Sequence, residues 1–457
     1  MAAIRNPLHS APVRNWREWG AAAVGLLAAL LLRLFQYRTI PSRAPNPDEW
    51  NWMWFGLSGL VGKPVTGWTL FWTAYPPANL SPPPPPFYEP LAHPYLDAPP
   101  LFAWIAGAAA WLDGDRTVTD TIHDPGPRLV GIALAIIAAA LAFALGRRLL
   151  GLAPALVGLF LFAVSPAAVV LGRLVAAEQL LAVLLLASLL AIYELRRAPG
   201  DRRWLGVLLA CCLVAPLAKA PGLAVGVSAA VLLASRRQFR PAGLAAGAAV
   251  AGQLLVLGYS ATQDWHTYVE LTRQRGLQLS AFTGYRFIAA SFGFDNQQMF
   301  DGWWLLGWLG LAELLGRRRG DWDLLTVPAV VYLLAMVGMT ADYSGSYGWY
   351  RLTIFPIVYL AAGRFLWLAA VEPSVPRLAL AAALGLATLA NFAAPLHFMP
   401  EPLILGAVVV VAVLPGLAAF VSPAWRREAI GAAIALLVLL LPVSVLEVLS
   451  LSAIFGR

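Results

Sequence analysis

The sequence predicts an all-α polytopic membrane protein with about thirteen transmembrane helices. Hydrophobic residues make up 60% of its 457 residues and charged residues only 12%, whereas about 25% of the residues in soluble domains are charged. The mean hydropathy is +0.71. Apolar stretches recur along almost the whole chain, and most approach the roughly 20 residues that a membrane-spanning helix needs.

These apolar stretches set the predicted spans. They cover 19–36, 128–146, 153–172, 179–193, 204–217, 222–234, 241–260, 301–316, 323–340, 352–371, 378–395, 402–421 and 429–452. The first span follows an N-terminal segment with three arginines. It has no clear signal-peptide cleavage site of small residues. We therefore expect an uncleaved membrane anchor.

The distribution of basic residues predicts the orientation. With the N-terminus inside, the segments between spans place 18 basic residues inside and 11 outside, although the outside segments are much longer. Cytoplasmic loops are enriched in Lys and Arg, so we expect a cytoplasmic N-terminus in a multi-pass protein of the cell (inner) membrane. The loops 37–127 and 261–300 then lie outside, against the membrane lipids.

Several other classes of protein are disfavoured. Cys211 and Cys212 are adjacent in an apolar run and form neither a disulfide framework nor a zinc quartet. The five histidines are scattered. The basic excess is first a topology signal, so we expect no nucleic-acid partner.

The first outside loop opens with two acids, Asp48 and Glu49, at the start of a predicted helix. Trp50, Met53 and Trp54 share one helical face, as in a helix that lies in the membrane interface. The acids are candidate functional groups there. The alternative is that they only begin the helix, because segment 46–49 also resembles a capping box with proline at the first helical position.

The same loop ends with Asp97, just before two prolines and a short apolar helix predicted over 99–112. We expect that helix to lie flat on the outer surface, because it is too short to span. Asp97 is either a functional carboxylate or the N-cap of this helix.

Glu178 lies at the outer end of a helical hairpin. A carboxylate flanked by apolar helix is costly unless it is paired, and it is therefore a functional candidate. The alternative is an ion pair with Arg173, but a separation of five residues is poor for a helical pair.

Several further basic and aromatic residues are candidate ligands for an anion. Lys219 is one of two lysines in the chain and lies between two spans on the outer side, where it either binds a phosphate or extends from a helix end to the interface. Arg273, Arg275 and Arg286 in the second outside loop, and Tyr350 with Arg351 at the end of another, lie among aromatic residues. Most such arginines only solvate an interface.

All of these acids and cations are predicted on one side of the membrane. Carboxylates placed near cations beside lipid suit a substrate that resembles a phospholipid. The cations would hold its phosphate, and a carboxylate would accept a proton from an acceptor.

At these positions the sequence resembles the polyprenyl-phosphate-dependent glycosyltransferases of the C-type membrane fold. The nearest groups are the lipid A aminoarabinose transferases and the protein O-mannosyltransferases. The resemblance rests on the Asp48-Glu49 pair and on five further motifs. These are YLDAPPLFAW at 95–104, PRLVG with RRLLG at 127–151, SP…GR…E at 165–178, LAKAPG at 217–222 and YRLTIFP at 350–356.

The resemblance implies a catalytic module over 1–371, which includes both outside loops, and C-terminal helices over 372–457. It implies that Asp48 is the catalytic base or its close partner, that Asp97 and Glu178 are further acidic site residues, and that Lys219 binds the donor phosphate. Two positions depart from the aminoarabinose transferases, which carry Arg where this chain has Asn51 and Lys where it has Ala98. Arg286 and Arg351 are our candidates for the missing phosphate contacts.

The expected function is the transfer of a sugar, with inversion, from a polyprenyl-phosphate donor to an extracytoplasmic lipid, glycan or protein. No cofactor is required by the sequence. A divalent metal ion shared by Asp48 and Glu178 is a candidate, although such ions usually need more oxygen ligands. The alternatives are a transporter of lipids or lipid-linked sugars, and an inactive membrane subunit with the same fold.

Overall fold

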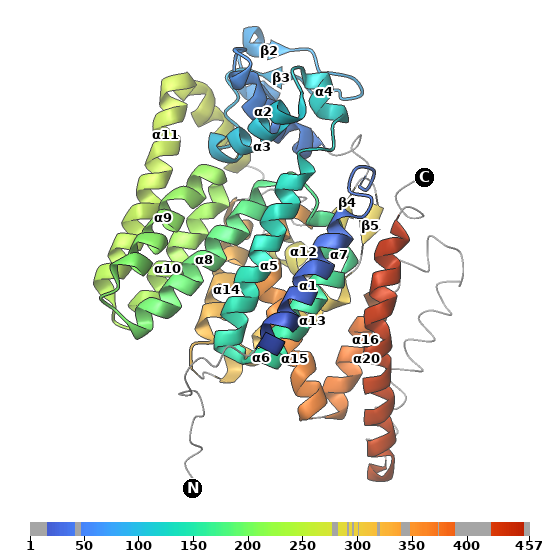
Figure 1. The fold of residues 1–457 in the computed structure, drawn as a ribbon. Helices are drawn as coiled ribbons and strands as arrows, with labels where there is room; N and C mark the ends of the chain where they lie inside the picture. The colour runs from blue at the N-terminus through green and yellow to red at the C-terminus, as the bar shows by residue number, and fades with distance from the viewer. Residues whose placement is uncertain are drawn as a thin grey trace.

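A helical bundle with a smaller cap at one end forms the architecture of the protein (Figure 1). The computed structural model describes residues 16–41, 47–276, 282–289, 292–294, 297–299, 301–317, 320–339, 348–372, 374–388 and 422–451. The bundle contains α1 (Trp16–Leu34), α5 (Arg128–Leu150), α6 (Leu152–Val164), α7 (Pro166–Leu171), α8 (Ala177–Arg197), α9 (Arg202–Ala218), α10 (Leu223–Ala234), α11 (Phe239–Gly276), α12 (Phe282–Ala289), α13 (Gly302–Arg317), α14 (Asp323–Met339), α15 (Phe355–Val371), α16 (Val375–Thr388) and α20 (Arg426–Leu449).

The predicted spans agree well with these helices. Each overlaps a described helix except 402–421, which lies outside the described residues. By length and composition, three described helices can cross a membrane, namely Arg128–Leu150, Ala177–Arg197 and Phe239–Arg275, and several apolar helices are shorter. The architecture is thus that of a helical membrane protein, while the total of thirteen spans stays a prediction.

One predicted span is wrong as a single helix. Segment 153–172 is divided between α6 and α7, because the chain turns at Ser165 and restarts at Pro166. The Ser165 side chain accepts a hydrogen bond from the Ala168 amide and caps the new helix. Hydropathy alone does not reveal this break, because both helices are apolar.

The cap consists of α2 (Pro47–Leu60), α3 (Pro100–Asp113), α4 (Val118–His123) and a small antiparallel sheet. Its strands are β1 (Gly67–Trp68), β2 (Leu80–Ser81) and β3 (Leu91–Ala92), in the order β1-β3-β2. The predicted helix starts near 47 and 99 are confirmed. The helices α2 and α3 meet backbone to backbone, because a Cβ atom at Gly56 would overlap the Ala103 carbonyl and one at Gly107 would overlap the Leu57 amide.

The helix α11 is longer than predicted and reaches the cap. It continues to Gly276, through much of the segment predicted as loop 261–300. The backbone bends at Asp264, whose carboxylate accepts hydrogen bonds from the amide and the hydroxyl of Thr267 and so starts a new helical segment. We call the part of α11 that follows this bend, residues 265–276, the α11 arm. Leu271 on this arm is buried against cap residues. A second short sheet, β4 (Phe292–Phe294) with β5 (Gln297–Met299), also lies within the predicted loop.

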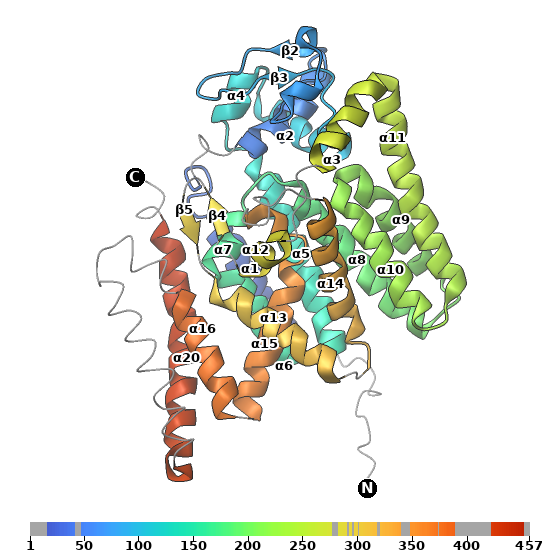
Figure 2. The same cartoon turned by 180° about the vertical axis from the view of Figure 1, so that it is seen from behind.

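Figure 2 shows α16 and α20 along one edge of the bundle, where α16 packs against α13 and α20. The predicted division of the chain after residue 371 falls at the end of α15. That division stays a prediction.

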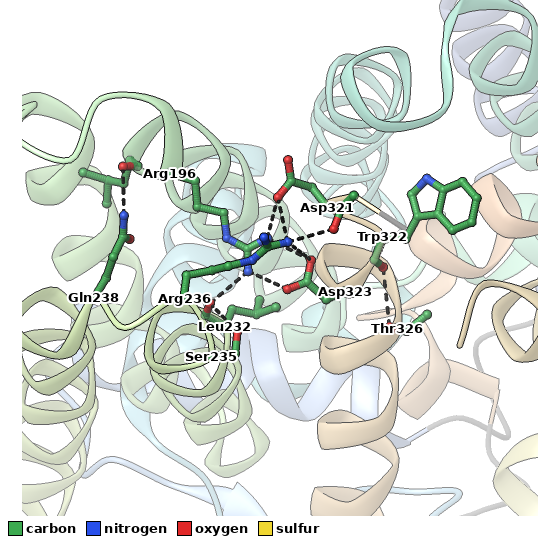
Figure 3. A network of polar contacts seen from close by, with 11 residues as sticks. Arg196, Leu232, Ser235, Arg236, Gln238, Asp321, Trp322, Asp323 and Thr326 are labelled. Carbon is green, nitrogen blue, oxygen red and sulfur yellow. Dashed lines mark hydrogen bonds and ion pairs between the residues drawn. The ribbon is translucent and has the colours of Figure 1, made fainter. Parts of the chain in front are cut away.

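An ion-pair network joins three segments predicted to be inside (Figure 3). Arg196 bonds to Asp321 at 2.9 Å and to Asp323 at 2.6 Å. Arg236 lies 3.4 Å from the same Asp321 carboxylate. Arg196, Arg236 and Asp321, which come from three separate segments, therefore lie on one face of the protein, as the predicted topology requires.

Cysteine labelling tests which face is outside. We expect an impermeant thiol reagent added to intact cells to label Tyr88→Cys but not Gly200→Cys, with Cys211 and Cys212 replaced by alanine. Tyr88 is 90% exposed on the cap, and Gly200 is exposed between α8 and α9. The reverse pattern would overturn the predicted orientation, and labelling of both positions only after lysis would contradict an exposed cap.

Candidate active site

Lys219 is the centre of the candidate site. It follows the last residue of α9, where the backbone becomes extended before η3 (Ala220–Gly222) and the α10 helix. Its Nζ atom lies 2.5 Å from Glu178 Oε1, and it lies 4.4 Å from the centre of the Tyr350 ring and 5.7 Å from that of Trp52. A largely buried ammonium is thus held by a carboxylate and two aromatic faces.

Glu178 holds Lys219 from the first turn of α8. Its side chain is 1% exposed, and Oε2 has no hydrogen-bond partner among the described residues. The alternative pairing with Arg173 is wrong. The Arg173 guanidinium donates instead to carbonyl oxygens at the end of α1 and beyond, those of Leu32, Arg33 and Ile40.

Asp48 faces the same cluster from the first turn of α2. Burial raises the pKa of its carboxyl, and the nearby Glu178 charge raises it further. The Lys219 charge and the neighbouring Trp349 side chain lower this pKa, but burial prevails. Trp52, one helical turn after Asp48, contacts Lys219 from the same face of α2.

Three consecutive residues of η5 (Gly348–Arg351) point to different partners. Trp349 lies beside Asp48, and Tyr350 packs on Lys219, where burial raises the pKa of the tyrosine to about 12. Arg351 is fully buried elsewhere, donates to the Arg286 carbonyl at 3.0 Å and lies over Trp304. The structure brings Tyr350 to Lys219, whereas Arg351 is turned toward α12 and α13.

Glu49 points away from this cluster. Its two carboxylate oxygens accept hydrogen bonds from Arg128 Nε at 2.9 Å and Nη2 at 2.6 Å. One of them also accepts from the Val175 amide. Both side chains are buried, so this pair joins α2 to α5 and to the segment before α8. We propose a structural role for Glu49 in place of a catalytic one.

Asp97 lies in a neighbouring polar cluster in the cap. It accepts hydrogen bonds of 2.7 Å from the hydroxyls of Thr69 and Tyr75, and Arg275 lies 3.6 Å away. The N-cap of α3 is Pro99, with no side-chain bond, so the alternative in which Asp97 caps this helix is wrong. Burial raises the pKa of the Asp97 carboxyl, which the three neighbours partly offset.

Asn51 and Tyr95 join the two clusters. Asn51 Nδ2 donates to the Tyr95 hydroxyl at 2.8 Å, and its Oδ1 accepts from the Trp68 amide at 2.7 Å. Asn51 follows Asp48 by three residues on α2, and Tyr95 precedes Asp97 by two. The charges of Asp48, Asp97 and Arg275 all act on the pKa of Tyr95, which burial raises. The sequence named Arg275 only beside Arg273 and Arg286 as a possible anion ligand, and it did not single out Tyr95.

The metal prediction has limited support from the geometry. The part of the chain that the structure describes contains no group of three or more His, Cys, Asp or Glu residues that could hold a metal ion. The Lys219 ammonium already occupies one oxygen of Glu178. A divalent ion shared by Asp48 and Glu178 stays a prediction.

Comparisons with known proteins point to one class. A family model described as dolichyl-phosphate-mannose-protein mannosyltransferase matches residues 97–259, which include Asp97, Glu178 and Lys219. A sequence search found no significant match among proteins with curated functions.

Two solved structures of ArnT share the fold. ArnT from Cupriavidus metallidurans bound to undecaprenyl phosphate matches with a TM-score of 0.55 and 16% identity, over 97% of this chain and 78% of that chain. Its apo state matches with a TM-score of 0.54 and 16% identity, over 98% and 78%. The oligosaccharyltransferase AglB from Archaeoglobus fulgidus gives a TM-score of 0.49 with 12% identity, over 93% and 56%.

The chain therefore has an ArnT-like fold. The resemblance to polyprenyl-phosphate-dependent C-type membrane glycosyltransferases, predicted from short motifs, is confirmed.

Proposed function

We propose that this protein is an inverting glycosyltransferase that moves a sugar from a polyprenyl-phosphate donor to an acceptor outside the cell membrane. The observation that carries the proposal is the cluster of Asp48, Glu178 and Lys219 at the cap end of the bundle. It combines a buried cation for a phosphate with a carboxylate whose raised pKa suits proton transfer.

The proposed reaction is a single displacement at the anomeric carbon. The acceptor hydroxyl oxygen forms a bond to that carbon while its proton passes to Asp48. The bond between the carbon and the phosphate oxygen breaks on the opposite face, and its electron pair leaves with the polyprenyl phosphate. Lys219 stabilises the charge that develops on the phosphate, and Glu178 positions the ammonium. The anomeric configuration inverts.

Transfer itself is the decisive test. Purified protein should move label from a labelled polyprenyl-phosphate sugar to a component of a membrane extract and release polyprenyl phosphate in equal amount. The purified protein should be tested with donors that carry different sugars, because selectivity for a sugar depends on its contacts in the pocket. In sealed vesicles, movement of intact donor across the bilayer without cleavage would favour a transporter. If the protein neither cleaves the donor nor moves it, an inactive subunit is favoured. Either of these two results contradicts the proposal.

Lys219→Ala should weaken donor binding by about ten- to hundred-fold, because losing a charge-assisted hydrogen bond costs about 1.5–3 kcal/mol. Affinity for a polyprenyl phosphate measures the effect. Lys63→Ala is the matched control, because Lys63 is exposed on the cap beside Trp54. Unchanged donor affinity in folded Lys219→Ala would leave Lys219 a structural partner of Glu178.

A further inference from the structure

We propose that Tyr332, on α14, is a positioning residue for donor binding, because it holds Tyr350 where the Tyr350 ring lies on Lys219. This inference rests on the proposed function and concerns a residue that acts only through another side chain. Tyr332 is buried within a helix that the sequence predicted only as a span, over 323–340.

The Tyr332 hydroxyl makes two hydrogen bonds to the segment that supplies Tyr350. It donates to the Tyr350 backbone carbonyl at 3.1 Å and accepts from the Thr353 hydroxyl at 2.9 Å. Thr353 Oγ1 also lies 3.5 Å from the backbone carbonyl oxygen of Glu178. Tyr332 and Thr353 are each 1% exposed, so the loss of either bond would leave a buried polar group without water to replace it.

The Tyr350 carbonyl differs from its two neighbours in η5. A short helix leaves carbonyl groups at its end without partners inside the helix, and η5 has only four residues. The carbonyl oxygens of Trp349 and Arg351 accept from backbone amides three residues further on. The Tyr350 carbonyl accepts from a hydroxyl of another helix. The position of Tyr350 therefore depends on α14.

The helix α14 contacts the candidate site at two places. It packs against η3, the turn that directly follows Lys219, and it holds η5 through Tyr332. The centre of the Tyr350 ring lies 4.4 Å from Lys219 Nζ, where the ring attracts the ammonium. One helix thus places both the cation and an aromatic face beside it, and the Tyr332 hydroxyl is a polar contact on which this arrangement depends.

The competing explanation is that Tyr332 only fills the core. Its ring packs against Phe287, with the ring centres 6.1 Å apart, and Phe287 packs in turn against Trp304. Tyr332→Phe keeps these ring contacts and removes only the hydroxyl. A role in core filling predicts an unchanged site in this variant, whereas a positioning role predicts that the Tyr350 ring leaves Lys219.

The first measurement observes Lys219 directly, because Lys219 and Lys63 are the two lysines of the chain. NMR of protein labelled with ¹³C at the lysine Cε gives one signal for each, and Lys63→Arg assigns them. Ring currents of Tyr350 and Trp52 shift the Lys219 signal, since both rings lie close to its Nζ atom. We expect this signal to move in Tyr332→Phe, while that of Lys63 stays in place.

Donor binding is the second measurement, made with a polyprenyl phosphate in nanodiscs. If the arrangement with Tyr350 on Lys219 falls to about one molecule in ten, the affinity should fall about tenfold, because only the competent fraction binds. The kcat at saturating donor should stay near wild type, since bound donor selects that arrangement. KM for the donor should therefore rise in Tyr332→Phe without a matching fall in kcat.

Tyr359→Phe is the matched control. Tyr359 is also fully buried, on α15, and the variant also loses a hydrogen-bonded hydroxyl. That hydroxyl bonds to Ser165 at 2.7 Å and to Asp301, away from Lys219. We expect the Lys219 signal and the donor affinity of Tyr359→Phe to match wild type. The melting temperature of each variant shows whether it is folded.

If Tyr332→Phe does not fold, Thr353→Val replaces it. This variant keeps the shape of the side chain but removes the hydroxyl that donates to Tyr332. The Lys219 signal should then move in the same direction by a smaller amount. A signal that stays in place would overturn the proposal.

The outcomes separate this proposal from the proposed function. Wild-type protein that binds no polyprenyl phosphate would overturn the function, whereas the Lys219 signal tests Tyr332 without any donor. An unmoved signal in folded Tyr332→Phe would overturn the positioning role, whether or not the affinity changes. A moved signal with unchanged affinity would also overturn it, because the positioned ring would then not serve the donor. An equal effect in Tyr359→Phe would assign the change to a general loosening of the bundle and would contradict the proposal.

Discussion

Asp48→Asn is expected to lower turnover by about 10²–10⁴-fold, the usual cost of losing a general base. The substitution keeps nearly the same shape and an oxygen that can cap the first turn of α2, so the cap should stay folded. Lys219 and Glu178 would keep their mutual contact, because neither depends on Asp48 for it. Turnover is measured beside the melting temperature, and the product configuration is determined by NMR.

The pH profile adds an independent signature of Asp48. Burial raises the pKa of this carboxyl above its ordinary value of 3.8, and a base must be deprotonated to act. Wild-type kcat/KM should therefore fall as the pH drops through that raised pKa, at a higher pH than for an ordinary aspartate. The residual activity of Asp48→Asn should lack this acid limb. Wild-type turnover in the variant, or a product with retained configuration, would refute the mechanism.

Arg128→Ala is expected to lower the free energy of unfolding by about 3–5 kcal/mol, because it leaves the buried Glu49 carboxylate without its partner. Both side chains are almost fully buried and share two hydrogen bonds. Chemical denaturation in detergent measures the loss. The same pair connects α2 to α5, so its removal should also loosen the attachment of the cap to the bundle.

The double variant Glu49→Gln/Arg128→Met separates stability from catalysis. Removing both charges avoids the uncompensated buried ion, so much of the lost stability should return. Turnover per folded molecule should then stay near wild type. A folded double variant with turnover reduced as strongly as in Asp48→Asn would show that Glu49 acts in the chemical step.

Most helices of the bundle, and the Glu178 and Lys219 pair at the centre of the candidate site, could be predicted from the sequence for physical reasons. Long apolar stretches have few alternatives to a spanning helix, and clustered arginines marked the segments that Figure 3 shows together. Glu178 and Lys219 stood out because charges within apolar sequence need partners, and the two are each other's partners.

The directions of neighbouring side chains could not be predicted. Successive residues of an α-helix are separated by about 100°, so Asp48 and Glu49 face different partners although both begin α2. Tyr350 and Arg351 diverge in the same way in the tighter turn of η5. The α11 arm was missed because polar residues around Asp264 end the apolar pattern, whereas the helix restarts there and carries Arg275 to Asp97.

The contact of α2 with α3 at Gly56 and Gly107 limits how this protein can diverge. Because backbone meets backbone there, no side chain is present whose size could change gradually and shift Asp48 in small steps. Even alanine would push the two helices apart. New acceptor preferences would therefore evolve by exchange of residues in the loops of the cap, such as the exposed segment around Tyr88. The helix that carries Asp48 would keep its place while the surface around it diversifies.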